Sequence, residues 1–228
     1  MGQSKYKRRE EVGKVTRHWF KENVQHRITK NDRKLLRFVY RHKLVTSHQI
    51  KRVFYKDSVM KNCNRRLRIL FDLYCLDRYF PPVDSGSSKQ HLLLDRAGAY
   101  AIGKVNFFKL NKPVRRYKHH RMVTEFDIVG YENGLGWAKL EKKKDSQIAD
   151  LYYPKIDMAV EIDTGTEGHK TLKNKIRGYN RSNISKVAFV TSGGVNRVEL
   201  WKDKIRSDIK FVGCKFEDIE ELVKIARK

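Results

Sequence analysis

The amino-acid sequence predicts a mixed α/β protein built from two domains. At 228 residues the chain is long enough for one large domain or two small ones, so its internal pattern has to decide. In the first half, apolar residues recur at helical spacing and are followed by two short strand-like runs; in the second half, strand-like and helical segments alternate. Charge divides the chain at the same place, since residues 1–118 hold 30 basic and 9 acidic side chains and residues 119–228 hold 21 and 17.

The formal net charge of +25 indicates a polyanionic partner. A basic segment gains entropy when it displaces counterions from nucleic acid, so DNA or RNA is the expected partner. A merely soluble cationic surface is the plain alternative. An acidic membrane is a third option, but no basic amphipathic helix with a bulky apolar face stands out, and the apolar content of 39% is too dilute for a membrane span. The composition also differs from that of an average soluble enzyme.

The cysteines and the first residues of the chain indicate the cellular compartment of the protein. Cys63, Cys75 and Cys214 are odd in number and widely spaced, which indicates neither a disulfide framework nor a zinc knuckle. The chain begins without the apolar core of a signal peptide. We therefore expect a reducing, cytoplasmic location.

Three helices are predicted in the first half. Residues 31–43 place apolar side chains at helical spacing, and Thr46 followed by Gln49 has the form of a capping box that begins a second, short helix. Residues 58–74 form a longer helix whose apolar stripe contains Cys63, Leu67, Leu70, Phe71 and Tyr74. Two short helices followed by a longer one are typical of a helix-turn-helix, whose last helix lies in the major groove.

The residues that follow these helices favour a winged helix over residues 31–103. Residues 76–83 and 90–94 are predicted strands joined by a turn-rich wing at residues 84–89, and Asp95 can cap a small helix over residues 96–102. Arg and Asn side chains can bridge base edges or hold phosphates; a solvated helix face is the alternative. The predicted DNA-binding residues are Lys61, Asn64, Arg65, Arg66, Arg68 and Lys89.

Two basic segments flank this domain. Residues 1–30 are predicted to be a basic N-terminal arm, for which disorder and a DNA-binding role are equally open. Residues 104–118 contain Pro113 without a sustained apolar period and are predicted to be a basic linker.

Residues 119–228 are predicted to form a smaller α/β domain. Its first helix covers residues 120–132, and His119, His120 and His169 are assigned to the surface or the linker because they do not form a metal pair at helical spacing. The remaining predicted elements are strands at 136–141, 147–153, 157–163, 186–192 and 209–214, and helices at 165–181, 198–206 and from Glu217 onward.

A group of carboxylates is predicted in this second domain. Residues 158–163 alternate strictly, so Glu161 and Asp163 share one face of the strand. If the preceding turn is made by residues 155–156, Asp150 lies opposite Glu161. Three such carboxylates suit Mg²⁺ or Mn²⁺, which can activate water for phosphodiester cleavage. The alternative is an acidic face that pairs with the neighbouring Lys-rich helix.

The sequence resembles the replication-relaxation proteins of bacterial plasmids and related mobile elements. The resemblance implies a winged helix followed by a restriction-endonuclease-like domain, similar to the PD-(D/E)xK nuclease fold. It spans about residues 31–195 and rests on Asn31-Asp32-Arg33, Asn64-Arg65-Arg66-Leu67, Leu94-Asp95-Arg96-Ala97-Gly98-Ala99, Asp150, Glu161-Ile162-Asp163-Thr164-Gly165-Thr166-Glu167, Lys173, Lys175 and Tyr179.

Two positions depart from the nuclease pattern. Ala149 stands where a Pro would precede the metal-binding Asp, and Asp163 stands where such a nuclease carries its catalytic Lys. A lysine on the next helix, Lys173 or Lys175, is expected to supply the missing charge, because Lys175 and Tyr179 lie four apart on one helical face beside the acidic strand. The predicted catalytic residues are therefore Asp150, Glu161, Asp163, Lys173 and Lys175, and Glu125 is a further carboxylate for which a solvated position is favoured.

The expected function is that of a DNA-binding protein of a plasmid or mobile element. It would act in replication initiation, relaxation or mobilisation, with double-stranded DNA and replication or mobilisation proteins as partners. Its nuclease-like domain would either simply hold the DNA or, in the enzymatic version, nick it by metal-assisted hydrolysis. The alternative is a transcriptional regulator, or antitoxin-like repressor, whose nuclease-like domain is catalytically inactive.

Overall fold

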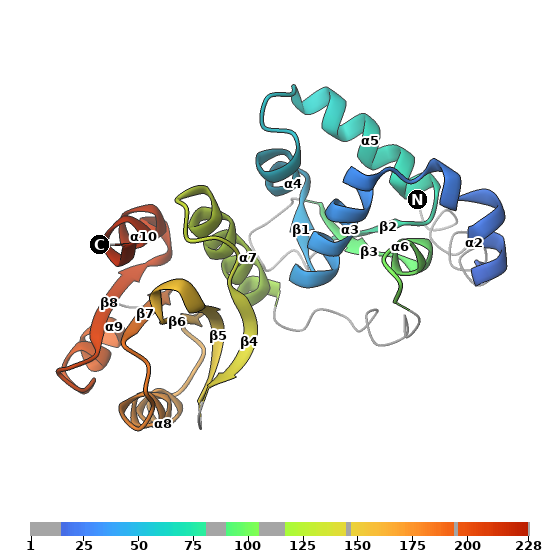
Figure 1. Ribbon diagram of the computed structural model, residues 1–228. Coiled ribbons are helices and arrows are strands. Elements are labelled where there is room, and N and C mark those ends of the chain that lie inside the picture. The colour runs from blue at the N-terminus through green and yellow to red at the C-terminus, as the bar shows by residue number, and fades with distance from the viewer. Residues whose placement is uncertain (1–14, 81–89, 105–116, 145–146, 194–195, 228) are drawn as a thin grey trace. The chain divides into compact units, whose positions relative to one another are not determined.

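The computed structural model describes residues 15–80, 90–104, 117–144, 147–193 and 196–227 (Figure 1). The chain forms two compact units, Met1–Tyr117 and Lys118–Lys228. Each unit has a sheet of its own, so the protein is of mixed α/β structure. In the described residues no helix is long and apolar enough to cross a membrane.

The first unit combines helices with a three-stranded antiparallel sheet of order β1-β3-β2. Val45 pairs with Leu92, and Leu76 pairs with Leu94, so β3 is the central strand. The elements are α2 (Arg17–Asn23), α3 (Lys30–His42), β1 (Val45–Thr46), α4 (Ser47–Phe54), α5 (Met60–Asp72), β2 (Leu76–Tyr79), β3 (His91–Leu94) and α6 (Arg96–Ala101).

Side-chain caps fix where these helices begin. Thr46 accepts a hydrogen bond from the backbone of Gln49, and the Gln49 side chain accepts one from the backbone of Thr46, which confirms the predicted capping box. Asp95 caps α6 as expected, and Thr29 and Asp32 form a second capping box at the start of α3. The predicted helices of this unit are confirmed within about two residues at each end.

Part of the predicted N-terminal arm is folded. Phe20 on α2 is buried and lies 6.0 Å from the ring of Tyr100, measured between ring centroids. Val15, Val24 and Ile28 are buried as well. Residues 15–30 therefore add a helix to the first unit, whereas residues 1–14 of the predicted arm, residues 105–116 of the predicted linker and the predicted wing at 84–89 lie outside the described residues.

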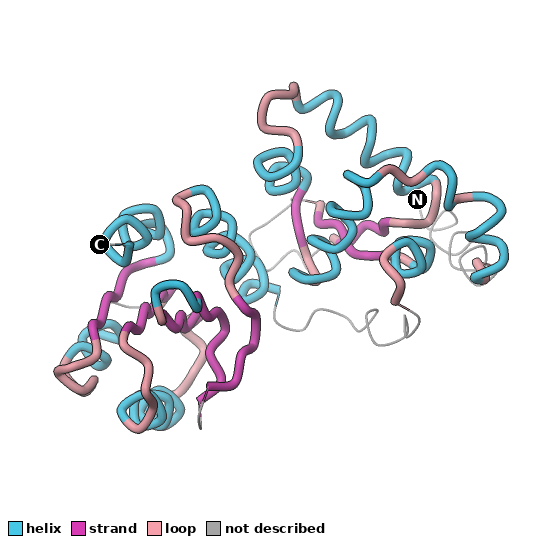
Figure 2. Tube along the Cα trace, viewed as in Figure 1, coloured by secondary structure: helices cyan, strands magenta, loops and turns pink. Residues whose placement is uncertain are grey.

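The second unit is a five-stranded sheet of order β4-β5-β6-β7-β8 with helices on both faces (Figure 2). Strands β4 to β6 are antiparallel, and β6 to β8 are parallel. The elements are α7 (Tyr117–Glu132), β4 (Lys139–Lys144), β5 (Gln147–Tyr153), β6 (Met158–Asp163), α8 (His169–Asn180), β7 (Lys186–Thr191), α9 (Asn196–Lys202), β8 (Lys210–Lys215) and α10 (Ile219–Arg227).

Successive side chains of β6 point to opposite faces of the sheet and contribute to two separate hydrophobic cores. Val160 and Ile162 pack with Phe126 of α7 and Leu222 of α10 on one face. Ala159 belongs to the core of the other face, which contains residues of α8 and α9 such as Leu172 and Trp201. All of β6 is buried, so charged residues on this strand need partners within the protein.

The turn before β6 differs from the prediction in its form. Pro154–Ile156 make one turn of 3-10 helix, and Asp157 follows with a left-handed φ of 45°. The resulting register pairs Leu151 with Val160, so the next positions along the two strands are Asp150 and Glu161. The predicted alignment of these two carboxylate positions follows from this register.

Candidate functional site

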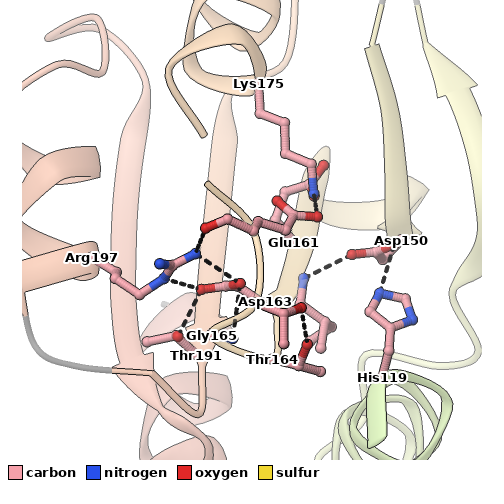
Figure 3. Close-up of polar contacts among 12 residues, drawn as sticks. His119, Asp150, Glu161, Asp163, Thr164, Gly165, Lys175, Thr191 and Arg197 are labelled. Atoms are coloured by element: carbon pink, nitrogen blue, oxygen red, sulfur yellow. Dashed lines mark hydrogen bonds and ion pairs between the residues drawn. The ribbon is translucent and has the colours of Figure 1, made fainter. Parts of the chain in front are cut away.

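Glu161 is the buried centre of the second unit's polar site. It lies on the central strand β6, and its carboxylate accepts a hydrogen bond from the Tyr179 hydroxyl at 2.6 Å. The Nζ atom of Lys175 lies 2.9 Å from the other Glu161 oxygen and also 2.9 Å from Glu167 (Figure 3). Lys175 and Tyr179 therefore reach the acidic strand from one face of α8, as the spacing of four residues predicts.

Burial decides the protonation of Glu161. Burial and the nearby charge of Asp150 raise the pKa of Glu161 to about 7, against the opposing effects of Lys175 and the Tyr179 hydrogen bond. Burial lowers the pKa of Lys175, but the charge of Glu161 and the hydrogen bonds to Glu161 and Glu167 outweigh it, so the net shift is upward. Lys175 is therefore a cation held between two carboxylates.

Asp150 is the second carboxylate of this site. Its Oδ2 atom accepts a hydrogen bond from the backbone amide of Ile162 at 2.8 Å, and its Oδ1 atom lies 3.1 Å from Nε2 of His119. Burial raises the pKa of Asp150, but the hydrogen bond and charge of His119, the Ile162 amide and the charge of Lys175 together bring it below its ordinary value. Asp150 is thus held as a carboxylate next to Glu161.

The position of His119 differs from the prediction, which assigned this residue to the surface or the linker. It lies on the first turn of α7 and contacts Asp150 rather than solvent alone. Its position could have been found from the sequence, because His119 precedes the buried residues Met122 and Val123 by three and four positions and so shares their inward helical face.

Asp163 has partners of its own. The guanidinium of Arg197 contacts both oxygens of Asp163, and the Thr191 hydroxyl and the Gly165 amide donate to the same carboxylate at 2.9 and 3.0 Å. Arg197 also donates to the backbone carbonyl of Glu167, which ties the loop after β6 to α9. Figure 3 shows Arg197 and Lys175 approaching the strand from different sides, one at Asp163 and the other at Glu161.

The structure thus divides the three predicted metal ligands into a pair and a separate residue. Asp150 and Glu161 are close enough to influence each other's charge, whereas Asp163 is held by Arg197. Across the described part of the chain, no group of three or more His, Cys, Asp or Glu side chains is arranged to hold a metal ion.

The other predicted residues of this site lie elsewhere. Lys173 is exposed on the outer side of α8, so of the two predicted lysines only Lys175 reaches the carboxylates. Glu125 on α7 lines a cleft of about 630 Å³ together with residues of α10 such as Glu221.

A second candidate surface is the outer face of α5 in the first unit. Its apolar stripe is buried through Cys63, Leu67 and Leu70, as predicted. The opposite side of the helix exposes Lys61, Asn62, Asn64, Arg65, Arg68 and Asp72. The cations Lys61, Arg65 and Arg68 lie three or four residues apart on this face, together with Asn amides and, four residues after Arg68, one carboxylate.

Arg66 differs from its neighbours on α5. Its guanidinium forms an ion pair with the buried carboxylate of Asp32, with Nε 2.8 Å from Oδ1, and donates to the carbonyl of Arg27 at 2.9 Å. The burial of Asp32 raises its pKa, but hydrogen bonds from Arg66 and Thr29 bring the net shift downward. Arg66 therefore joins α5 to the start of α3. Lys89, also predicted to contact DNA, lies outside the described residues.

Comparison with known proteins finds one family. A family model described as replication-relaxation matches residues 36–197, which is more than half of the chain and runs from α3 to the start of α9. The searches of curated proteins and of solved structures find no match.

Proposed function

Because the chain belongs to the replication-relaxation family, we propose that it is a DNA-binding protein of a plasmid or another mobile element, acting in replication initiation, relaxation or mobilisation. The formal net charge of +25 supports a polyanionic partner. The exposed face of α5 is the observation that carries the proposal, because Lys, Arg and Asn are the residue types that contact phosphates and base edges.

The order of elements in the first unit supports a winged helix. Helix α3, strand β1, helices α4 and α5, and the antiparallel pair β2–β3 follow one another in the order expected of that fold, with β1 completing a three-stranded sheet. In this interpretation α5 is the helix that enters the major groove. The predicted wing, residues 84–89, falls between β2 and β3 in the sequence and lies outside the described residues.

Binding to the element's own DNA tests this proposal. Duplex fragments that tile the plasmid or element carrying the gene are offered to the full-length protein, and we expect one fragment to be bound in preference to the others. Asn64→Ala and Arg65→Ala should each cost about 1 to 3 kcal/mol at that site if these side chains read base edges. Equal retention of all fragments by wild type and variants would remove α5 as a sequence reader.

Phosphodiester cleavage is a second candidate function, supported by the group Asp150, Glu161 and Lys175. The second unit has a helix, three antiparallel strands, a helix and a parallel strand in succession, which supports a restriction-endonuclease-like fold. Two carboxylates on adjacent strands with a lysine beside them provide the residue types of a PD-(D/E)xK site, with the lysine on α8 rather than on β6. Asp163, paired with Arg197, would then be a positioning residue for the loop after β6.

Asp150 and Glu161 provide part of the ligand set that a hard cation such as Mg²⁺ requires. Mg²⁺ is commonly held by one or two protein carboxylates together with waters and substrate phosphate, and Asp150 and Glu161 supply that donor set. An ion at this site would compete with Lys175 and His119 for the carboxylate oxygens. When bound, Mg²⁺ or Mn²⁺ would polarise the phosphate and activate water, and Lys175 would hold positive charge beside it.

A nicking assay on supercoiled plasmid distinguishes a nuclease from a transcriptional regulator that has no catalytic activity. The full-length protein is incubated with its own element's DNA and Mg²⁺ or Mn²⁺, alongside Asp150→Asn, Glu161→Gln and Lys175→Met, with Lys210→Gln on β8 as an exposed control. Nicked circles from wild type and control, and none from the three variants, are expected of a nuclease. DNA binding without nicking in either metal would leave a transcriptional regulator with an inactive nuclease-like unit as the better account.

A further inference from the structure

The outer face of α8 carries a continuous row of cations. These cations belong neither to the exposed face of α5 nor to the site around Asp150 and Glu161. Lys170, Lys173, Arg177 and Arg181 are all exposed, the last directly after the helix. Their spacings of three and four residues place them above one another on one side of a helix. We call these four residues the α8 stripe.

The α8 stripe is not paired with any carboxylate of the described residues. The helix His169–Asn180 contains no Asp or Glu, and within the described ranges no carboxylate pairs with any of the four cations. Nη1 of Arg177 lies 3.4 Å from the amide oxygen of Asn174. Lys175, by contrast, points to the sheet and is paired with both Glu161 and Glu167.

Repulsion within such a row is relieved by a polyanion. Like charges four residues apart on a helix repel one another, and a bound chain of phosphates relieves this repulsion. From the first to the last residue the stripe is about 16 Å long at the helical rise. Phosphates of one DNA strand repeat every ~3.4 Å along the duplex axis, so the stripe can face several of them.

We propose that the α8 stripe binds the phosphodiester backbone of DNA and gives the second unit a DNA contact of its own. The inference rests on the proposed DNA-binding function and adds a second surface to α5. Charge complementarity selects this partner. An acidic membrane fits less well, because the exposed residues of α8 are polar and offer no bulky apolar side chain for insertion.

This surface contributes affinity without sequence preference. Lysine and arginine on phosphates position a protein on the duplex but read no bases. The inward face of the same helix holds Lys175 against Glu161, so DNA bound along the stripe lies on the element that lines the acidic site. The stripe and the acidic site therefore lie on opposite sides of α8.

A salt-dependent binding experiment with the full-length protein tests the stripe. The fourfold variant Lys170→Gln, Lys173→Gln, Arg177→Gln, Arg181→Gln is compared with wild type on a random-sequence duplex over a range of salt concentrations. A matched control removes four exposed cations from α7, β4 and α10, through Lys118→Gln, Arg121→Gln, Lys139→Gln and Lys224→Gln. A third variant, Lys61→Gln, Arg65→Gln, Arg68→Gln, removes the cations of α5, and thermal unfolding checks that all variants fold.

The slope of log K against log salt measures neutralised phosphates, each contributing about −0.9. We expect the stripe variant to lose about 2 to 4 in the magnitude of this slope, and the control to change by less than about 1. Equal slopes for stripe variant and control would overturn the inference, while loss of binding in the α5 variant would still support the proposed function. Failure of wild type to bind any DNA would overturn both.

Discussion

Arg197 and Asp163 form a two-point ion pair that joins α9 to the end of β6. Nε of Arg197 lies 2.5 Å from Oδ2 of Asp163, and Nη2 lies 3.1 Å from Oδ1. Asp163 is buried, and its carboxylate also accepts hydrogen bonds from the Thr191 hydroxyl and the Gly165 amide. The residue that sequence pattern groups with Glu161 therefore serves to hold the loop after β6.

Loss of this pair should destabilise the protein. In Arg197→Met the buried carboxylate of Asp163 loses its charge partner, and breaking one side of a buried pair costs about 3 to 5 kcal/mol. Urea unfolding should show a loss of about that size. Arg177→Met, which removes an exposed guanidinium from α8, should change the unfolding free energy by less than about 0.5 kcal/mol. Equal effects of the two substitutions would mean that the Asp163 pair is not structural.

Glu161 should make stability fall as pH rises. Its pKa is about 7 in the folded protein and 4.5 ordinarily, so the folded state holds the proton more tightly, and stability is lost between about pH 4.5 and pH 7. Glu161→Gln removes this titration. The unfolding free energy of the Gln variant minus that of wild type should therefore increase by about 2 kcal/mol from pH 5 to pH 8. A difference that stays constant over this range would contradict the raised pKa.

Neighbouring arginines on α5 should behave differently. Arg65 is exposed, so Arg65→Ala should weaken DNA binding with little effect on stability, whereas Arg66→Ala leaves buried Asp32 without its guanidinium partner and should cost about 3 kcal/mol of stability. Urea unfolding and DNA titration of the two variants measure the contrast. Reversed results, with Arg65→Ala unstable and Arg66→Ala stable but unable to bind, would exchange the two roles.

Gly98 should tolerate no side chain although it lies in a helix. A Cβ atom at this position of α6 would overlap the carbonyl oxygen of Cys75. Gly98→Ala should therefore lower the unfolding free energy by about 2 kcal/mol, opposite in sign to the usual gain in helix propensity. Gly168→Ala is the control, because a Cβ there meets nothing within 4 Å. A stabilised Gly98→Ala variant would show that α6 can move away from the Cys75 carbonyl.

Local signals in the sequence predicted the elements well. The Thr46 and Gln49 capping box is present with both of its hydrogen bonds, because a cap is decided by residues three apart. The alternation of β6 likewise sends Val160 and Ile162 to one core and Ala159 to the other. The helix α2 was not predicted, since it buries Phe20 alone among its described residues, and the buried residues Val24 and Ile28 follow it sparsely within a basic segment.

The partners of the charged residues could be predicted only in part. Lys175 reaches Glu161 as its helical spacing beside Tyr179 suggests, whereas Asp163 and Arg197 are 34 residues apart and meet only because β6 and β7 are parallel neighbours. A signal was present, since residues that follow two adjacent parallel strands lie at the same sheet edge, but strand order is set by tertiary packing rather than by local pattern.

The DNA affinity of the full-length protein, with and without the cations of α5, tests whether this helix binds DNA. Wild type should bind duplex DNA with a steep salt dependence, and replacing Lys61, Arg65 and Arg68 by Gln should reduce the magnitude of the salt slope by about 2 to 3 without loss of folding. A triple variant that binds as tightly as wild type at every salt concentration would contradict the assignment of α5 as the DNA-binding helix.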